Sequence, residues 1–245
     1  MAEELRDGGV GTSRRVRTSS QVQREVTQLI LDRGLRPGAA MPTETSLMEQ
    51  LGVSRNSVRE ALKALQALDI VEIRHGYGTY VGRASLTPLV DGLTFRTLAQ
   101  QEDDVRALAE ILQVRRVLEE GLMVQVAAAV TDEELDALDE IIARMEESGR
   151  AGQGFPGPDR IFHETLYRSL DNALVTQLLG VFWDVCHRVA DARGWIDGAS
   201  PAVTAHRHRD IVTALRARDP EAARQAMADH FQGVDAWAAQ MRAPR

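Results

Sequence analysis

Four side chains in the second half of the chain are of types that could bind a metal ion together. The stretch DRIFHETLYRSL places Asp159 and His163 four positions apart beside apolar residues at helical spacing, so the two polar groups share one helix face. His208 begins a later amphipathic run and His230 ends another, so both can point inward. Imidazole and carboxylate groups suit Zn²⁺, Ni²⁺ or Mn²⁺. The alternative is that the histidines are hydrogen-bonded core residues and that Asp159 pairs with His163 on a helix surface.

The elements that must position these residues are helices. Amphipathic periodicity predicts them over about residues 103–130, 131–148, 158–170, 172–193, 201–218 and 220–241. Thr131 and Glu134 supply a TxxE capping box for one helix, and Asp219 followed by Pro220 supplies a start for another. This half of the chain is therefore predicted to be an antiparallel helical bundle.

The first half of the chain has a different organisation. Residues 1–19 are polar and aperiodic, which predicts a mobile arm. Two short helices that Thr43 and Ser54 cap precede the stretch IVEIRHGYGTYV, which predicts two short strands around a glycine-containing turn. A first helix is expected over residues 20–33, with an inner face formed by Val22, Val26, Ile30 and Leu31.

These patterns predict a mainly α protein with two units. Residues 20–82 form a winged helix-turn-helix with a small β-hairpin, and residues 83–102 form a linker or short helix. Residues 103–245 form the all-α antiparallel helical bundle.

The helix that Ser54 caps has polar residues crowded at its exposed start. Arg55, Asn56, Ser57 and Arg59 suit the first turns of a recognition helix, where arginine reads guanine and asparagine or serine reaches base edges or phosphates. The helix starts at Thr43 and Ser54 can receive phosphate oxygens. At the turn of the hairpin, Arg74, His75 and Gly76 suit a wing that lies along a minor groove. The alternative is an αα-hairpin with solvated arginines.

The stretch MPTETSLMEQLGVSRNSVREALKALQALDIVEIRHGYGTYV resembles the winged helix-turn-helix of the GntR-family bacterial transcription regulators. The family's Pro-Ser-Glu, Ser-Arg-x-x-Val-Arg-Glu-Ala-Leu and Gly-x-Gly-Thr-Phe/Tyr-Val motifs match residues 42–44, 54–62 and 76–81. Many members carry Arg after the Glu, where this chain has Thr45, and this departure predicts a different operator preference. The resemblance implies a DNA-binding surface formed by Thr43, Glu44, Thr45, Ser54, Arg55, Asn56, Ser57, Arg59, Arg74, His75 and Gly76.

The second half of the chain resembles the FadR-type C-terminal ligand-binding domain called FCD. Its marks are LQVRRVLE, DRIFHETLYRSLDN and HRDIVTALRARDPEAARQAMADHF. The resemblance implies a metal, most simply Zn²⁺, whose ligands are Asp159, His163, His208 and His230. Arg115 would bind the carboxylate of an effector, and an ion pair with Glu119 is the alternative role for it. His206 lies outside the matching position.

Composition limits the classes of protein that fit. The chain of 245 residues has one cysteine, no N-terminal apolar signal and no run of about 18 apolar residues, which predicts a cytoplasmic protein without a membrane span. Its net charge of −7 divides into +2 for residues 1–84 and −9 for the remainder. This asymmetry suggests two units with different partners.

The sequence therefore predicts a ligand-responsive transcription regulator, with repression as the expected action. It would bind a palindromic operator as a homodimer, controlled by a small organic acid of the sugar-acid or hydroxy-acid class at the metal centre. One rival is a metal-dependent hydrolase or oxygenase, but no nucleophile, general base or cofactor loop accompanies the histidines. A second rival is a sensor for which the metal itself is the effector.

Overall fold

The computed structural model describes residues 18–100, 104–195 and 200–241. The chain folds into two units, one up to Pro88 and the other from Leu89. The predicted fold class is confirmed, because helices account for nearly all regular structure in the described residues and the first unit carries one small hairpin. The mobile arm predicted over residues 1–19 lies outside the described residues as far as residue 17.

The first unit consists of three helices and a hairpin. Its elements are α1 (Ser19–Asp32), α2 (Glu44–Leu51), α3 (Arg55–Ala67), β1 (Val71–Arg74) and β2 (Gly78–Val81). Thr18 caps α1 in a reciprocal capping box with Gln21, so the helix begins one residue earlier than predicted. Thr43 and Ser54 cap α2 and α3, and Gly52 ends α2 in the left-handed conformation.

A small apolar core holds this unit together. Val22, Val26 and Ile30 form the buried face of α1 and pack with apolar residues of α2, α3 and both strands. The prediction that Leu31 shares this face is wrong, because 66% of Leu31 is exposed. A step of one residue turns the side chain by about 100° around a helix axis, which takes Leu31 away from the face of Ile30.

The hairpin is antiparallel, with Val71 opposite Val81 and Arg74 opposite Gly78. Gly76 and Gly78 have φ values of 79° and 107°, a region that L side chains rarely adopt, so both turn positions need glycine. Residues 38–41 run beside β2 and bind its backbone through Gly38 and Met41. This extra strip of hydrogen bonds anchors the hairpin to the helices.

The second unit is built from helices throughout its described residues. They are α4 (Thr87–Leu98, whose first residues precede the division), α5 (Asp104–Ala129), α6 (Asp132–Arg150), α7 (Pro156–Leu166), α8 (Ala173–Arg193), α9 (Pro201–Arg216) and α10 (Pro220–Met241). A 3₁₀ turn, η1 (Arg168–Leu170), follows α7 where the sequence predicted continued helix. Much of the segment expected to be a linker or short helix forms α4, which is tied to α8 by the ion pair of Asp91 with Arg188.

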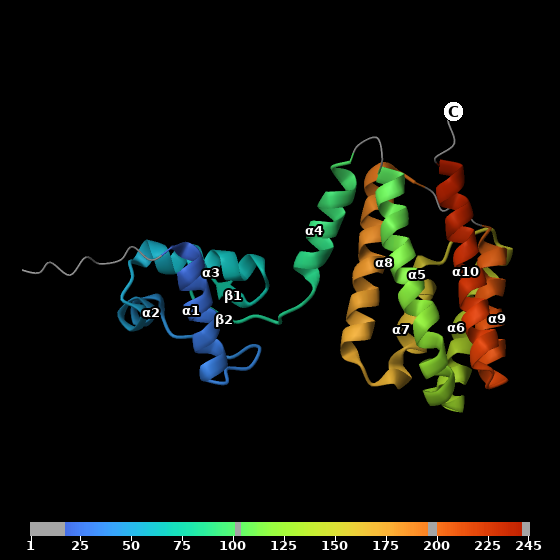
Figure 1. Ribbon diagram of the computed structural model, residues 1–245, viewed down its shortest axis with the longest axis horizontal. Helices are drawn as coiled ribbons and strands as arrows, with labels where there is room; N and C mark the ends of the chain where they lie inside the picture. Colours follow the sequence, from blue (N-terminus) through green and yellow to red (C-terminus); the bar gives the residue numbers. More distant parts are fainter. Residues whose placement is uncertain (1–17, 101–103, 196–199, 242–245) are drawn as a thin grey trace, which may run out of the picture. The chain divides into compact units, whose positions relative to one another are not determined.

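Six of these helices form a ring (Figure 1). Following the contacts, α5 packs on α10, α10 on α9, α9 on α6, α6 on α7, α7 on α8, and α8 on α5. Ion pairs of Arg209 with Asp139 and Glu146 reinforce the α6–α9 contact. The interior of this ring receives the polar side chains of α5, α7, α9 and α10 that the sequence singled out. None of the helices in the described residues is long and apolar enough to span a bilayer.

Candidate metal centre and DNA-binding surface

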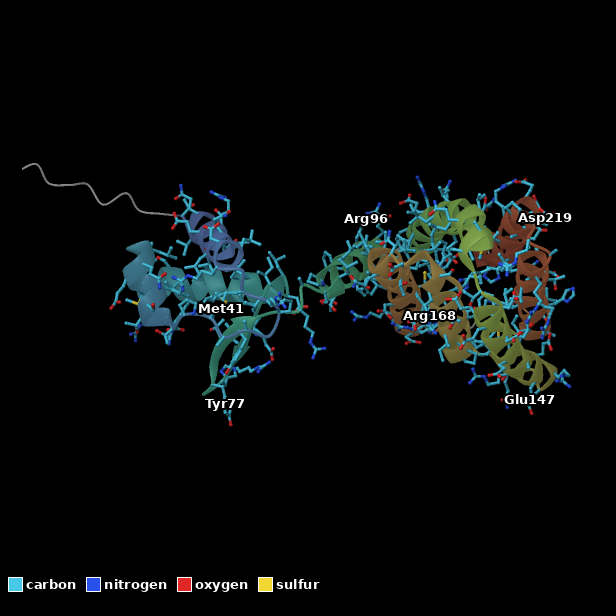
Figure 2. All side chains as sticks on the ribbon, turned by 90° about the horizontal axis from the view of Figure 1, so that it is seen from below. Met41, Tyr77, Arg96, Glu147, Arg168 and Asp219 are labelled. Atoms are coloured by element: carbon cyan, nitrogen blue, oxygen red, sulfur yellow. The ribbon has the colours of Figure 1, made fainter. Side chains whose placement is uncertain are left out.

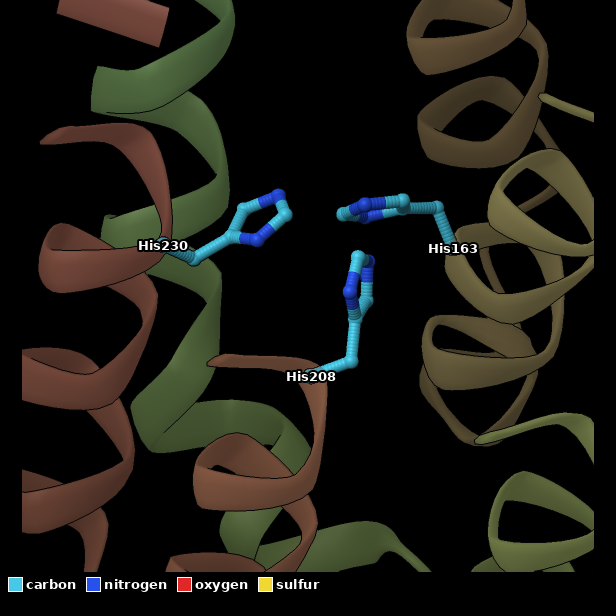
Figure 3. A group of neighbouring side chains, drawn as sticks. All are labelled: His163, His208 and His230. Atoms are coloured by element: carbon cyan, nitrogen blue, oxygen red, sulfur yellow. The ribbon is translucent and has the colours of Figure 1, made fainter. Parts of the chain in front are cut away.

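Three histidine rings converge inside the helical ring (Figure 3). His163 comes from α7, His208 from α9 and His230 from α10, and one nitrogen of each ring lies within 4.8 Å of those of the others. All three side chains are buried. Asp159, one helical turn before His163, places Oδ1 at 3.0 Å from Nε2 of His208. The structure therefore brings together all four residues that the sequence suggested as metal ligands.

The hydrogen bonding of His208 identifies the lone pair that faces the centre. Its Nδ1 lies 2.8 Å from the backbone carbonyl oxygen of Thr204, and a carbonyl oxygen only accepts, so the proton of a neutral ring is assigned to Nδ1. Nε2 then presents a lone pair towards the carboxylate of Asp159. Two electron-rich atoms 3.0 Å apart in a buried site require a cation, and both can be ligands of one ion.

His163 is oriented by a carboxylate on a different helix. Its Nδ1 lies 2.6 Å from Oε2 of Glu119 on α5, a close charge contact without good hydrogen-bond alignment. Glu119 is completely buried and also accepts hydrogen bonds from the Nε of Arg115 and the hydroxyl of Tyr167. A carboxylate behind a histidine fixes its ring and raises its basicity, as in many metal sites.

The carboxylates of the site remain ionised and His230 remains neutral, which are the protonation states that metal binding requires. Burial would raise the pKa of Asp159, but His208, His163 and Arg115 together hold that pKa well below its usual range. Burial opposes the charge of Glu119 in the same way, yet Arg115, His163 and Tyr167 lower the pKa of its carboxyl group. Burial, with the neighbouring histidines, lowers the pKa of His230, which keeps this ring neutral.

Several buried histidine nitrogens without a hydrogen-bond partner indicate whether the site suits a metal ion. Both nitrogens of His163, Nε2 of His208 and Nδ1 of His230 are buried and have no well-aligned hydrogen bond among the described residues. Buried polar atoms are nearly always satisfied in native proteins, and Nδ1 of His163 at least has Glu119 close by. One nitrogen of each of the three rings is then left to be explained. Three imidazoles and one carboxylate are a suitable donor set for Zn²⁺, and Ni²⁺ and Mn²⁺ accept the same groups. The residues present fit a metal ion.

A cavity of about 560 Å³ lies beside the metal centre. Asp159 and His230 form part of its wall, and Arg115, Cys186 and Arg207 also line it. The volume falls within the range of small-molecule sites. Burial raises the pKa of Cys186 to about 11, so this thiol remains protonated at neutral pH. The cavity therefore offers two arginine side chains and a neutral thiol beside the metal centre.

Arg115 forms the ion pair that the sequence offered as its alternative role, and it also lies where an effector could reach it. Its Nε donates to Oε1 of Glu119 at 2.5 Å, which is the ion pair of the alternative reading. The side chain also lines the cavity, with its guanidinium 5.6 Å from the centre of the Phe231 ring. The ion pair with Glu119 therefore holds the guanidinium at the wall of the cavity.

The first turn of α3 presents polar groups to solvent in the first unit. Arg55 and Asn56 are exposed, and Arg55 forms no ion pair with any described residue. Ser54 and Ser57 bond to each other through their hydroxyl groups at 2.9 Å. Arg59 lies close by and donates from Nε to both carboxylate oxygens of Glu44. Thr43 and Thr45 are exposed at the start of α2.

The hairpin tip differs in one respect from the prediction. Arg74 is not at the tip but ends β1, where it pairs with Glu72 and its guanidinium lies 4.2 Å from the centre of the Tyr80 ring. His75 and Gly76 form the exposed turn as expected. Tyr77, which the sequence analysis did not select, projects from the tip with 82% of its surface exposed (Figure 2).

Sequence reasoning missed three residues of these sites. Glu119 was considered only as a partner of Arg115, and Tyr167 was not considered at all. The distance between them in the chain hides their hydrogen bond, although Arg115 and Glu119 four apart on an apolar helix gave a local signal. Tyr77, between two glycines of the turn, was visible as an exposed aromatic. His206 is largely exposed and pairs with Asp210, away from the metal centre.

The two units and their sites define a class of protein: a regulator with a helix-turn-helix head and a helical sensor unit. Residues 18–81 match the family "Bacterial regulatory proteins, gntR family", and residues 110–233 match "FCD domain". The chain belongs to the GntR family of bacterial transcription regulators and carries an FCD domain, which is consistent with the FadR-type subfamily.

The chain is similar to known proteins over most of its length. The HTH-type transcriptional regulator YcbG of Bacillus subtilis is 30% identical over 96% of this chain and 95% of its own length. The galactonate operon transcriptional repressor of Escherichia coli K12 is 25% identical over 78% of this chain and 83% of its own length. A solved structure, Streptococcus agalactiae GntR, has a TM-score of 0.65 at 28% identity and covers 89% of this chain and 98% of its own. The first two of these proteins are named as transcription regulators. GntR regulators bind operator DNA, and FCD domains bind small-molecule effectors.

Proposed function

We propose that the protein is a homodimeric repressor whose affinity for a palindromic operator is controlled by a small organic acid at a metal centre. The observation that carries this proposal is the convergence of Asp159, His163, His208 and His230 beside a cavity of about 560 Å³. Zn²⁺ is the ion we expect, with Ni²⁺ or Mn²⁺ as alternatives. Operator binding would take place in the bacterial cytoplasm, where the chromosome lies.

The four donors would hold the ion, and each has a second contact that positions it. Thr204 orients His208, Glu119 stands behind His163, and Asp159 is kept ionised by its neighbours. A bound ion supplies a positive centre with a coordination position that an effector oxygen can fill. The protein's contribution is a rigid, buried arrangement that needs little rearrangement when the effector arrives.

The chemistry of the cavity favours a carboxylate as effector. Arg115 has N–H groups beyond the one that Glu119 accepts, and these can donate to a carboxylate inside the cavity. A pure metal sensor would not need a cavity of this size next to its ion. The name of the related galactonate operon repressor supports a sugar acid, and a hydroxy acid presents the same carboxylate and neighbouring hydroxyl.

One face of α5 suits a contact with a second copy of the chain. Val114, Val117 and Val124 are 51%, 66% and 50% exposed. With Gly121 and Ala128, which are also exposed, they recur at alternating steps of three and four residues, the spacing of a helix–helix seam. A self-complementary stripe of this kind fits a two-fold dimer, and a dimer presents two recognition helices to a palindrome.

The test begins with the operator and the acid. DNA fragments selected by the purified protein would be titrated at fixed Zn²⁺, with and without galactonate, gluconate and lactate. We expect specific binding that one class of acid weakens. Relief of DNA binding by Zn²⁺ alone, with no response to any acid, would support the metal sensor and contradict our assignment of the cavity.

The dimer is tested separately by light scattering of Val117→Arg. We expect this charge on the proposed seam to yield monomers and to weaken palindrome binding. Val203→Arg is the matched control, because Val203 is 48% exposed on α9 and lies outside the stripe. A Val117→Arg protein that remains dimeric would exclude this face of α5 as the interface.

A further inference from the structure

Arg207 is a cavity residue that the proposed function leaves unused. It projects from α9, one position before His208, and lines the same cavity as Asp159 and His230. Its guanidinium forms no ion pair or hydrogen bond with any residue that the structure describes. Arg207 is only partly buried, so its guanidinium keeps contact with solvent and does not require a carboxylate of the protein. An unpaired guanidinium in this position is available to a ligand.

The packing around Arg207 keeps its guanidinium at the cavity wall. A Cβ atom on Gly233 would lie 2.2 Å from Nη1 of Arg207, so the side chain occupies the space that only glycine leaves open. Gly233 also lines the cavity. It follows His230 by three residues, which corresponds to about 4.5 Å along the axis of α10. Arg207 therefore lies roughly one helical turn beyond the metal centre.

The two arginines of the cavity differ in whether a carboxylate of the protein pairs with them. Arg115 is neutralised by Glu119, whereas Arg207 is not paired. The acidic residues that line the cavity are Asp159, which faces His208, and Asp191, which is exposed on α8. Among the described residues neither carboxylate forms an ion pair with Arg207, so its positive charge remains available to a ligand. A three-carbon hydroxy acid at the metal would leave most of about 560 Å³ unfilled, and it has no second anionic group to place against Arg207.

We propose that Arg207 binds a second anionic group at the far end of the effector, so that the preferred ligand is an organic acid charged at both ends. This inference rests on the proposed function, because it needs the first carboxylate at the metal centre. The planar guanidinium forms paired hydrogen bonds with either a carboxylate or a phosphate. Aldaric acids and phosphorylated sugar acids both meet this requirement.

The test compares three six-carbon acids that differ at one position. Gluconate has an alcohol at C6, glucarate has a carboxylate there, and 6-phosphogluconate has a phosphate ester. Their dissociation constants would be measured by calorimetry on the full-length, zinc-loaded protein. We expect at least one of the doubly charged acids to bind about 10- to 100-fold more tightly than gluconate, as for a charge-assisted pair.

Variants then assign the preference to Arg207. In Arg207→Ala the advantage of the doubly charged acid should disappear while gluconate binding changes little, and Arg207→Lys should retain part of it. Arg144→Ala is the matched control, because Arg144 is exposed on α6 and does not line the cavity. It removes the same charge and should keep the full preference.

The outcomes separate this inference from the proposed function. Equal or tighter binding of gluconate by the wild-type protein overturns the role of Arg207 and leaves the metal-centre effector intact. Arg207→Ala weakening all acids alike overturns it as well. If none of the three acids binds the zinc-loaded protein, both the inference and the sugar-acid assignment are wrong.

Discussion

A histidine nitrogen that faces a buried carboxylate shows how much one contact can specify. Nε2 of His208 and Oδ1 of Asp159 are 3.0 Å apart, and Nδ1 of the same ring is committed to Thr204. For a neutral ring this contact is repulsive, so either a proton or a metal ion must lie between the two atoms. The additional rings of His163 and His230 favour the metal ion, since a proton would need only one acceptor.

His208→Ala should therefore reduce the zinc content of the purified protein. The variant loses one of four donors and frees Asp159 from its partner, so we expect substoichiometric metal by elemental analysis and a blunted response to the acid effector. His206→Ala is the control, because His206 lies on the same helix but points to solvent. Full zinc occupancy in His208→Ala would refute the assignment of this ligand.

Glu119→Gln should separate the support of the metal centre from the ligands themselves. The amide keeps the size of the side chain but removes the charge that faces Arg115 and His163. We expect zinc affinity to fall about 10- to 100-fold. The free energy of unfolding should fall by about 3 kcal/mol, since a buried arginine loses its counter-charge.

The control for Glu119→Gln is Glu221→Gln. It breaks an exposed pair with Arg224 and should change the free energy of unfolding by less than about 1 kcal/mol. Chelator competition measures the zinc affinity, and chemical unfolding measures the free energy of unfolding. The two effects of Glu119→Gln are thus tested independently. Unchanged zinc affinity in Glu119→Gln would show that this carboxylate serves stability alone.

At the scale of the elements, the start of α3 connects local structure with DNA recognition. Ser54 caps the helix and bonds to Ser57, so the first turn is fixed before DNA is present. Arg59 is held by Glu44 of α2, while Arg55 has no such partner among the described residues. Arg55 is thus the residue of this turn with its guanidinium most available to a base.

Arg55→Ala should weaken operator binding by about 1–3 kcal/mol and relax the preference at one base pair. The unit should remain folded, because Arg55 is exposed and contributes nothing to the apolar core. Lys63→Ala on the same helix is the control, and it should have a smaller effect on operator affinity. Equal affinity of Arg55→Ala and the wild-type protein would remove Arg55 from the contact surface.

The sequence predicted the helices accurately where local signals mark their starts. Capping residues such as Thr43, Ser54 and Thr131 act within a few positions, so the starts of their helices were correct. Contacts that depend on the ring of helices left no local signal. Tyr167 and Glu119 are 48 positions apart, and their pairing follows only once η1 meets α5. Arg74 was placed one residue too far along, because the register that pairs it with Gly78 and ends β1 depends on the opposite strand.

At the scale of the whole molecule, the two units have different chemistry. The first presents an exposed arginine and asparagine at a helix start, and the second encloses metal-binding groups and a cavity. Regulation requires that binding at one site changes the free energy of binding at the other. The effector must therefore bind the DNA-bound and DNA-free states of the protein with different affinity. A coupling of about 1–3 kcal/mol would change operator affinity about 5- to 150-fold.

Linkage makes this coupling measurable from either side. If an acid lowers operator affinity by a given factor at fixed Zn²⁺, saturating operator DNA must lower the affinity for that acid by the same factor. We expect calorimetric titration of the acid, with and without the operator, to reproduce the factor obtained from DNA binding. In Arg55→Ala, operator at a concentration that this variant does not bind should leave the acid's affinity unchanged. Two unequal factors in the wild-type protein would contradict this coupling and would mean that the acid displaces DNA by another route. Removal of the metal ion is one such route, because a chelating acid changes the protein's zinc content and not its conformational equilibrium.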